Sequence, residues 1–394
     1  MTTVSEAEQI IAACQANFGT EHIDFRQARG RKLAENLVAD RQMPPFDRVT
    51  MDGVAIDFAA FEAGTRTFQI ESVAAAGQPQ TALHQTTNCV EVMTGAMLPL
   101  RANTVVRYED LKLENGMATL QTDDIRLGQN VHLYGSDRAA GQLIVPKGRV
   151  LSAAEIGLAA ALGKVTVLVD KNPRVVIIST GNELVAVAAQ PLAHQIRNSN
   201  GYALAAALER TGIVAENIHL KDDKSLIENE LARCLAEYDV VLLSGGVSAG
   251  KFDFVPAALE KLGVQKLIYK VEQRPGKPFW FGKSPSGTFV FALPGNPVST
   301  FMCLTRYVLP WLCSTFETQK FAVLARDVVF KPALTYFLQV KCTQTPDGRT
   351  MATPVMGNGS GDAANLADAD AFMELPNTKN EFLAGESYRI WEYR

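Results

Sequence analysis

Residues 240–254 read VVLLSGGVSAGKFDF, an apolar run that ends in a glycine-rich turn. The run predicts a buried strand, and the turn brings Lys251 and Asp253 together directly after it. A glycine-rich turn exposes backbone N–H groups that no side chain shields, and these groups can bind a phosphate or another oxyanion. The lysine adds a positive charge, and the aspartate can hold a divalent ion. The stretch therefore predicts an anion site at the carboxyl end of a strand.

The same turn nearly matches the phosphate-binding loop of nucleotide hydrolases. Four residues separate Gly245 from Gly250, and Lys251 follows. However, Phe252 stands where that loop needs serine or threonine to bind Mg²⁺, and no apolar strand ending in aspartate accompanies it. A P-loop-like hydrolase is therefore a minor alternative, which ATP turnover by the protein alone would revive.

Two other stretches have the same organisation. RVVIISTGNELV, residues 174–185, predicts a strand that ends before Glu183, and GTFVFALPGNPVSTF, residues 287–301, predicts one that ends before Gly295 and Asn296. Ligands of open α/β sheets bind beyond the carboxyl ends of parallel strands, so the three loops should border one crevice. None contains the GxGxxG pattern of dinucleotide-binding proteins.

Composition limits the kinds of protein this chain can be. Its 394 residues favour two to four domains, and a net charge of −4 without a basic block argues against a nucleic-acid partner. No run is long enough to cross a membrane, and the first residues lack the apolar core of a signal peptide. Six scattered cysteines and five separated histidines predict neither disulfides nor a zinc site. We expect a cytoplasmic protein.

The order of strand and helix patterns predicts a multidomain α/β protein. Alternation over residues 171–317 predicts a central parallel-sheet domain, and short β runs over residues 318–394 predict a C-terminal β-barrel. Another set of β runs predicts a small β domain at 47–137, inserted into a helical linker domain of residues 1–46 and 138–170.

Helix starts in the linker domain are predicted from local patterns. Ser5 with Glu8, and Ser152 with Glu155, fit the capping box that opens a helix. A further helix is expected over residues 27–37.

A series of short motifs runs along the whole chain. It consists of Thr50-Met51-Asp52-Gly53, Thr94-Gly95-Ala96, Gly135-Ser136-Asp137, Thr180-Gly181-Asn182-Glu183-Leu184, Ser199-Asn200, Gly245-Gly246-Val247-Ser248, Pro275-Gly276-Lys277-Pro278, Leu293-Pro294-Gly295-Asn296-Pro297-Val298-Ser299 and Gly359-Ser360-Gly361-Asp362. In this order the set resembles the molybdopterin molybdenumtransferases, which insert molybdenum into the pterin dithiolene of molybdenum cofactor.

The resemblance implies a reaction and a quaternary structure. Adenylylated molybdopterin binds together with molybdate, the phosphoanhydride is cleaved with the help of Mg²⁺, AMP leaves and the metal enters the dithiolene. It also implies a homodimer, whose active cleft combines the α/β domain of one subunit with the small β domain of the other. A molybdopterin adenylyltransferase and molybdoenzymes are candidate partners.

Carboxylates in glycine-bearing loops are the candidates for catalysis and metal binding. The resemblance favours Asp52, Asp137, Glu183 and Asp253 as catalytic groups, and Glu183 and Asp253 also as metal ligands because they follow strand ends. Asp223 is a third candidate ligand, although its neighbour Asp222 fits the pattern equally well. For each of them the alternative is a helix cap or a solvated loop charge.

Molybdate, a tetrahedral dianion, needs cations and hydrogen-bond donors. Lys277 in RPGKP is the leading candidate, as a catalytic group, with Arg274 beside it, although both could simply flank a turn. Further candidates for binding the substrates are Thr94, Gly245, Gly246, Ser248, Lys251, Gly295, Asn296 and Ser360. Thr94 and Ser360 could equally be turn residues.

Three positions depart from what the resemblance implies. Asn182 and Asn198 stand where aspartate is common, and Gln339 stands where an arginine is usual. They put the metal stoichiometry and the affinity for molybdate in question. A non-catalytic dimeric scaffold of the same fold is the main alternative function, and tungstate is an alternative substrate that the sequence does not distinguish from molybdate.

Overall fold

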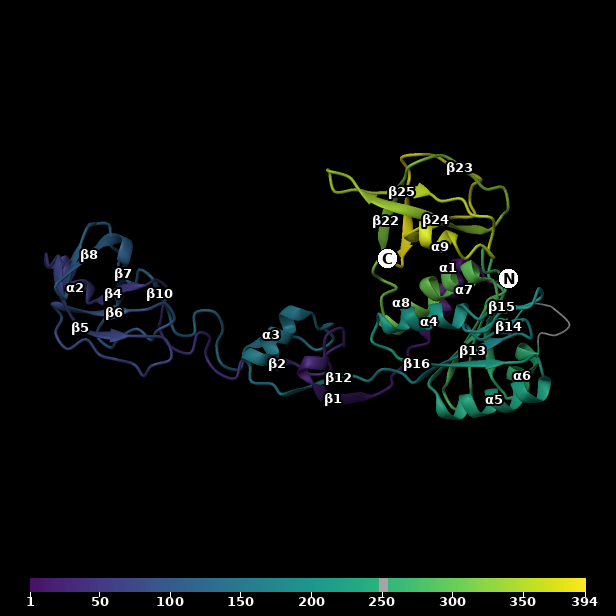
Figure 1. Ribbon diagram of the computed structural model, residues 1–394, viewed down its shortest axis with the longest axis horizontal. Coiled ribbons are helices and arrows are strands. Elements are labelled where there is room, and N and C mark those ends of the chain that lie inside the picture. The colour runs from purple at the N-terminus through teal and green to yellow at the C-terminus, as the bar shows by residue number, and fades with distance from the viewer. Residues whose placement is uncertain (248–253) are drawn as a thin grey trace. The chain divides into compact units, whose positions relative to one another are not determined.

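The computed structural model describes residues 1–247 and 254–394, which form two compact units (Figure 1). Unit 1 contains Met1–Gly19 and Lys171–Arg394, and unit 2 contains Thr20–Asp170. Unit 1 comprises an α/β domain and a C-terminal barrel, which share a hydrophobic core. Unit 2 comprises a small β domain and a group of short strand pairs with one longer helix. The multidomain α/β class predicted from the sequence is confirmed.

The α/β domain is built on a six-stranded sheet with the order β16-β13-β17-β21-β20-β18. The first four strands are parallel, whereas β20 runs antiparallel to both of its neighbours, so the sheet is mixed. In sheet order, the strands are Ala215–Leu220, Val175–Thr180, Val240–Ser244, Phe289–Leu293, Trp280–Lys283 and Gln265–Tyr269.

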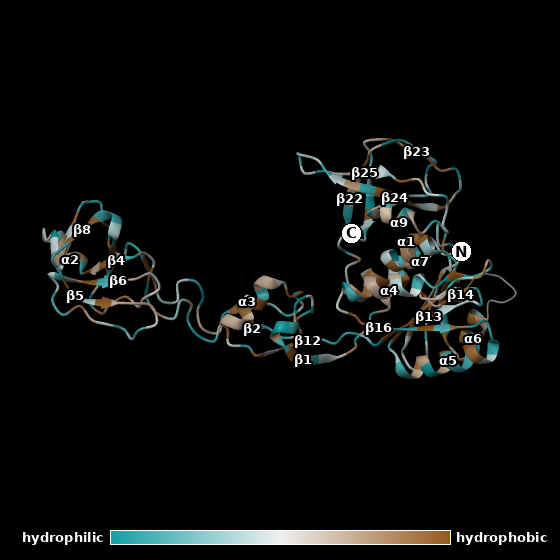
Figure 2. Cartoon of the chain, viewed as in Figure 1, coloured by the Kyte–Doolittle hydropathy of each residue, from teal (hydrophilic) through white to brown (hydrophobic). Residues whose placement is uncertain are grey.

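Helices cover both faces of this sheet because consecutive strand residues point to opposite sides. Ile177 and Leu242 pack toward one set of helices, and Ile178 and Leu243 pack toward the other. The central strands β13, β17 and β21 are mainly apolar, and Figure 2 shows hydrophobic colour at β13. The first set is α1 (Val4–Ala13), α4 (Asn200–Glu209), α7 (Pro297–Cys303), the π-helix η3 (Leu304–Val308) and α8 (Leu309–Cys313), and the second is α5 (Lys224–Glu237) and α6 (Val255–Lys261).

The C-terminal domain is a closed barrel of five strands. The strands follow the order β24-β25-β22-β28-β26, and β26 pairs back to β24, which closes the ring. The short strand β19 (Gln273–Arg274) of the α/β domain joins the edge of β24 in parallel. In ring order, the strands are Thr335–Gln344, Thr350–Pro354, Lys320–Leu324, Ser387–Glu392 and Ala371–Leu375. The smaller elements are α9 (Asn365–Asp368) and the strand pair β23 (Val328–Val329) and β27 (Glu381–Phe382).

Unit 2 contains a second six-stranded sheet, with the order β7-β4-β6-β5-β9-β8. In that order the strands are Thr104–Arg107, Gly53–Ile56, Asn88–Val92, Thr67–Ala74, Met117–Leu120 and Leu111–Glu114, with α2 at Phe58–Glu62. The other strands pair two by two: β1 (Thr20–Asp24) with β12 (Thr166–Asp170), β2 (Leu37–Val38) with β11 (Leu143–Val145), and β3 (Arg48–Val49) with β10 (Val131–His132). The longer helix is α3, Ala153–Ala161, and it opens with the predicted Ser152–Glu155 capping box. We keep the division of this unit at residues 47 and 137 as a proposal.

The N-terminal helix differs from its prediction. Its capping box is formed by Thr3 and Glu6, two residues before the expected pair Ser5 and Glu8. The helix buries Ala7 and Ile11 in the core of the α/β domain. Residues 1–19 therefore belong to unit 1 and not to the helical linker domain in which the sequence placed them.

The prediction of a helix over residues 27–37 is wrong. Only a short 3₁₀ turn, Phe25–Gln27, forms, and the chain beyond it is extended. Lys32 bridges to Val150 and Leu33 bridges to Val169, so pairing with distant segments outweighs the helix propensity of this stretch.

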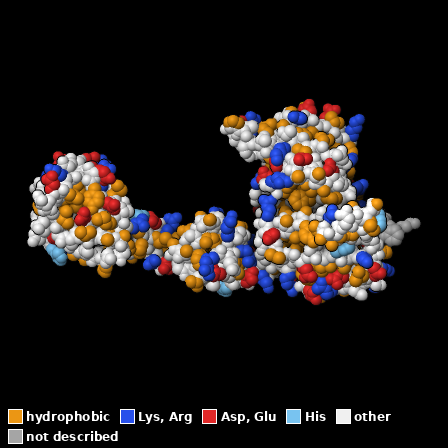
Figure 3. Space-filling view, in the orientation of Figure 1, with side chains coloured by type: hydrophobic (Ala, Val, Ile, Leu, Met, Phe, Trp, Pro, Cys, Tyr) orange, Lys and Arg blue, Asp and Glu red, His pale blue; other side chains and the backbone are white. Residues whose placement is uncertain are grey.

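Two features can be compared with the composition: the charges on one face of unit 1 and the length of the helices. Figure 3 shows Lys and Arg side chains interspersed with Asp and Glu on the face of unit 1 that it draws, without a broad basic patch. Among the helices of residues 1–247 and 254–394, none has the length and apolarity that a bilayer crossing needs.

Candidate active site

A cavity of about 1110 Å³ lies in unit 1, at the carboxyl ends of the four parallel strands. The loops that follow β13, β16, β17 and β21 contribute to its wall, together with the loop 273–278 and residues of the barrel. The shared crevice expected from three strand ends is therefore present, with a fourth strand end added. Eight of the predicted site residues line it: Glu183, Gly245, Gly246, Arg274, Lys277, Gly295, Asn296 and Ser360.

The turn after β17 needs its two glycines for close packing as well as for its shape. Gly245 and Gly246 have φ of 95° and 69°, a region that side chains rarely adopt. A Cβ on Gly245 would lie 2.9 Å from the carbonyl oxygen of Thr180, and one on Gly246 would lie 2.9 Å from the Thr180 hydroxyl. The turn is therefore bare on its cavity side and pressed against the end of β13. The other predicted residues of this turn, Ser248, Lys251 and Asp253, lie outside the described residues.

One asparagine ties three parts of the wall together. The side-chain Nδ2 of Asn200, in the first turn of α4, donates to Ser244 Oγ at 2.9 Å and to Gly295 O at 2.7 Å. It also lies 3.3 Å from the Thr300 hydroxyl. The ends of β17 and β21 are thereby held against the start of α4, which fixes the cavity floor.

Glu183 and Asp222 are the acidic residues that line the described part of the cavity. They follow neighbouring parallel strands, whose last residues, Thr180 and Leu220, are paired. Asn182 joins the two loops, because its N–H donates to Asp222 Oδ2 and its Oδ1 accepts from the Asp222 N–H, both at 3.2 Å. A neutral amide next to Asp222 avoids the repulsion that a third carboxylate would add.

Asp223 does not line the cavity. It is the N-cap of α5, and its side chain accepts from the Leu226 N–H at 2.8 Å. The helix-cap alternative therefore describes this residue, and Asp222 takes its place as a candidate ligand.

The described residues determine which kind of metal site the cavity can offer. Within residues 1–247 and 254–394, no group of three or more His, Cys, Asp or Glu side chains is arranged to hold a metal ion. Mg²⁺ needs no such group, because it is commonly held by one or two carboxylates together with substrate phosphates and water. Glu183 and Asp222 fit that mode of binding.

Arg274 and Lys277 bring positive charge to the cavity from the loop between β19 and β20. Both side chains are exposed, and neither forms an ion pair with a carboxylate of the described residues. Between them, Gly276 has φ of 86° and a Cβ there would lie 2.7 Å from Cys303 Sγ. The tight turn thus packs against α7 at Gly276, and it exposes the side chains of Arg274 and Lys277.

The barrel supplies the opposite wall. Ser360 Oγ accepts from Asn296 Nδ2 at 2.8 Å, which leaves its own hydroxyl proton available to a ligand. Gln339, 9% exposed, accepts from Asn365 Nδ2 at 2.9 Å, and its own Nε2 is buried and has no partner among the described residues.

The predicted residues of unit 2 form two polar pairs. Asp52 accepts from the Thr94 hydroxyl at 2.7 Å and from the Thr94 N–H at 2.6 Å, and these bonds lower the pKa of the Asp52 carboxyl. Asp137 Oδ1 lies 2.8 Å from His132 Nε2, while Arg48 donates to His132 Nδ1 at 3.0 Å. Because Nδ1 accepts from the arginine, Nε2 carries the proton and donates to Asp137.

Two residues that shape the site, Asn200 and Gln273, have no role that the sequence predicts. Asn200 stands in a quoted motif, but its three partners lie 44 to 100 residues away. Gln273 stands between the charged residues Glu272 and Arg274, which give no sign that its amide is wholly buried.

The fold and the cavity define a multidomain α/β protein whose strand-end loops border one cavity. Residues 2–163 match the MoeA N-terminal region (domain I and II), residues 176–313 a probable molybdopterin binding domain, and residues 322–393 the MoeA C-terminal region (domain IV). A molybdopterin molybdenumtransferase of Synechocystis sp. is 40% identical, over all of both chains, and one of Bacillus subtilis is 31% identical over 98% of this chain and 93% of its own. The chain belongs to the molybdopterin molybdenumtransferase family, which is a family of transferases of molybdenum cofactor biosynthesis.

Solved structures agree with the family assignment. Two crystal structures of the molybdopterin biosynthesis MoeA protein from Pyrococcus horikoshii superpose with TM-scores of 0.83 and 0.81. They are 28% and 26% identical in sequence, and each covers at least 99% of both chains.

Proposed function

We propose that the protein transfers molybdenum from molybdate to adenylylated molybdopterin, with cleavage of the phosphoanhydride and release of AMP. The observation that carries this proposal is the cavity in which glycine turns, the carboxylates of Glu183 and Asp222, and the cations of Arg274 and Lys277 meet. A diphosphate-bearing ligand needs all three, because its charge must be bound at several oxygens at once.

The oxyanion site is the best supported part. Arg274 and Lys277 offer positive charge without competing carboxylates among the described residues, and Ser360 offers a donor from the facing barrel wall. Gln339 stands where an arginine is usual, so the barrel residues that line the cavity add no positive charge. Tungstate has the same shape and charge, and it remains a second candidate substrate.

The carboxylates suit a divalent cation at the diphosphate. Glu183 and Asp222 would hold Mg²⁺, with Asp253 as a further candidate beyond the described residues. The ion would neutralise charge on the oxygens of the breaking phosphoanhydride. The protein's own contribution is to place the phosphates against the turn at Gly245 and Gly246, and to join the two acidic loops through Asn182.

We infer that the second half of the site comes from unit 2 of a partner subunit in a homodimer. Unit 2 carries its own polar set, with Asp52 and Thr94 bonded together and Asp137 oriented by His132. Asp52, Thr94 and Asp137 are exposed. A molybdopterin adenylyltransferase would supply the substrate and molybdoenzymes would receive the product. All six cysteines are unpaired, which suits a reducing compartment such as the cytoplasm.

The test is to incubate the full chain with adenylylated molybdopterin, Mg²⁺ and molybdate and to measure AMP. We expect AMP release that depends on molybdate. Lys277→Ala should raise the molybdate concentration for half-maximal release by about tenfold or more, since a charge-assisted bond is lost. Binding of the adenylylated pterin should change far less. Lys341→Ala, which removes a lysine paired with Asp370 on the barrel surface, is the control and should behave as the wild type.

Other outcomes would favour the alternatives. Turnover of ATP without any pterin would identify a nucleotide hydrolase. Binding of the pterin by a stable dimer that never releases AMP would identify a scaffold. Equal losses of molybdate and pterin binding in Lys277→Ala would show that its role is misassigned.

A further inference from the structure

The loop that carries Arg274 and Lys277 is held from inside the protein by one glutamine. Gln273 is 0% exposed, and its Nε2 donates to the carbonyl oxygen of Gly276 at 2.9 Å. This bond closes the turn across Pro275 and sets the direction in which the chain enters residue 277. The Lys277 carbonyl is fixed in turn by the N–H groups of Val271 and Phe279, at 3.0 and 2.9 Å.

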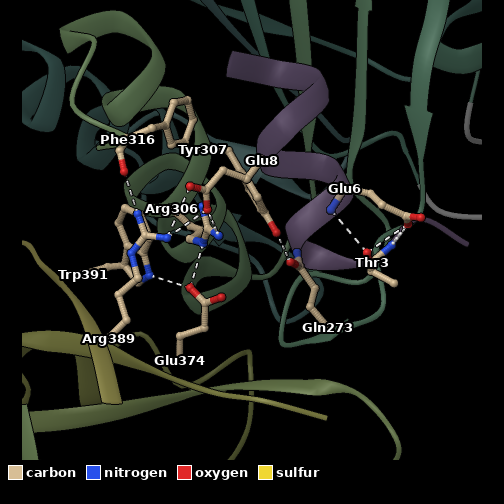
Figure 4. A network of polar contacts seen from close by, with 10 residues as sticks. All are labelled: Thr3, Glu6, Glu8, Gln273, Arg306, Tyr307, Phe316, Glu374, Arg389 and Trp391. Carbon is tan, nitrogen blue, oxygen red and sulfur yellow. Dashed lines mark hydrogen bonds and ion pairs between the residues drawn. The ribbon is translucent and has the colours of Figure 1, made fainter. Parts of the chain in front are cut away.

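The other end of the same amide is also occupied. The hydroxyl of Tyr307 donates to Gln273 Oε1 (Figure 4). Cys303 Sγ lies 3.6 Å from Gln273 Nε2. Tyr307 is fully buried, and burial raises the pKa of its phenol well above the usual value, so the hydroxyl stays protonated and can only fix the amide by donating. Every hydrogen-bonding atom of Gln273 is therefore used, and its amide cannot flip without losing a buried bond.

Tyr307 is itself held by its position in the π-helix η3. All five residues of this segment are buried, and its neighbour Arg306 is 1% exposed and bonded to Glu8 and Glu374. A π-turn is a rare element that often accompanies functional sites. Here it lets consecutive residues serve two directions, the arginine toward α1 and the barrel and the tyrosine toward the cavity loop (Figure 4).

We propose that Tyr307 and Gln273 are positioning residues, which act through the Gly276 carbonyl to aim Arg274 and Lys277 at one oxyanion. Neither residue touches the substrate in this assignment. The inference rests on the proposed function, because it takes the two cations as the oxyanion site. It adds that their affinity for the anion depends on a buried chain of hydrogen bonds behind the cavity wall.

The experiment compares three variants in the full chain. Tyr307→Phe keeps the ring and removes the hydroxyl, and Gln273→Met keeps the volume and removes both bonds. Thr305→Val is the matched control, because it removes another buried hydroxyl of the same π-helix, bonded at 2.8 Å to the Phe301 carbonyl, without contacting the loop. Two quantities are measured: the Kd of molybdate alone by calorimetry, and the Kd of adenylylated molybdopterin.

We expect Tyr307→Phe to weaken molybdate binding by about fivefold to tenfold, the usual effect of one buried hydrogen bond. Gln273→Met should weaken it at least as much. The Kd of the pterin should stay within about twofold, and Thr305→Val should leave both constants unchanged at a similar loss of Tm. If Tyr307→Phe binds molybdate as Thr305→Val does, the positioning role is wrong while the proposed function stands. If the wild type itself neither binds molybdate nor releases AMP, the proposed function fails, and this inference fails with it.

Discussion

Gly246 shows how one missing side chain can shape a site. Its φ of 69° and the 2.9 Å approach to both Thr180 Oγ1 and Val255 Cγ2 mean that any side chain there must displace β13 or α6. The residue therefore contributes twice, by leaving the turn bare for a ligand and by letting two elements meet.

We expect Gly246→Ala to lower the free energy of unfolding of unit 1 by about 1–3 kcal/mol, from the strained φ together with overpacking. Gly361→Ala is the control, since Gly361 also lines the cavity but has an ordinary φ and no atom within 4 Å of an added Cβ. Denaturant titration followed by tryptophan fluorescence reports on unit 1 alone, because all three tryptophans lie in it. Equal midpoints for the two variants would show that the turn yields easily.

Some residues of the cavity could be predicted from the sequence alone, and others could not. Glu183 and Asn296 were found because each follows a strand pattern within a few residues, and strand ends in a parallel sheet converge. Lys277 was found through the motif Pro275-Gly276-Lys277-Pro278. Asn200 and Gln273 were not found, because an amide reveals its role only through partners that the fold brings from distant segments. A local pattern cannot contain that information.

The N-terminal helix makes the same point for a whole element. The pattern of a capping box fits Thr3 with Glu6 and Ser5 with Glu8 equally well. The choice is made by Arg306, 298 residues away, which bonds to Glu8 and leaves Glu6 to cap the helix. In contrast, Glu155 has no such distant partner, and the Ser152–Glu155 box formed where the sequence predicted it.

Helix α3 offers a test of that cap by pH. Bonds from the Ser152 hydroxyl and N–H lower the pKa of Glu155 from 4.5 to about 2. A lowered folded-state pKa means that the ionised cap stabilises the protein fully above pH 4.5 and that this stabilisation is lost as the pH falls toward 2. The gap in Tm between the wild type and Glu155→Gln should therefore be constant near neutral pH and shrink between pH 4.5 and 2. A gap that does not change over this interval would mean that the carboxylate is not the group that caps the helix.

The π-helix η3 joins three elements through one buried charge. Arg306 bonds to Glu8 of α1 and to Glu374 of β26, and Arg389 of β28 bonds to Glu8 at 2.9 Å. The ring centroid of Trp391 lies 4.3 Å from the central guanidinium carbon of Arg306 and 4.1 Å from that of Arg389, and all three residues are drawn in Figure 4. This cluster connects the α/β domain to the barrel, whose residues form one wall of the cavity.

Removing that charge should be costly. Arg306→Met leaves the Glu374 carboxylate with only the indole N–H of Trp391, and an uncompensated buried charge costs about 3–5 kcal/mol of unfolding free energy. The double variant Arg306→Met with Glu374→Gln should recover part of that loss. Arg349→Met, which breaks an exposed pair with Asp347, should cost less than about 1 kcal/mol. The same fluorescence titration measures all three, and a loss in Arg306→Met no larger than in the surface control would show that the cluster is not a significant source of stability.

The complete molecule presents its polar groups on two separate units, with cations and acids in unit 1 and a second acidic set in unit 2. The proposed homodimer explains why both sets exist. If each cleft combines unit 1 of one subunit with unit 2 of its partner, then a defect in unit 1 and a defect in unit 2 can be separated by mixing subunits.

At a molybdate concentration below the half-maximal value of the wild type, Lys277→Ala and Asp52→Asn should each release little AMP on its own. In a mixed dimer with the shared cleft, one site collects both defects and the other has neither, so random mixing restores about one quarter of the wild-type rate. If the cleft instead lies within one subunit, every site keeps one defect and no activity returns. Mixing Lys277→Ala with Glu183→Gln is the control, because both changes lie in unit 1 and leave no intact site in either arrangement. Gel filtration of the mixture establishes whether dimers are present, and dimers without restored AMP release would rule out the shared cleft.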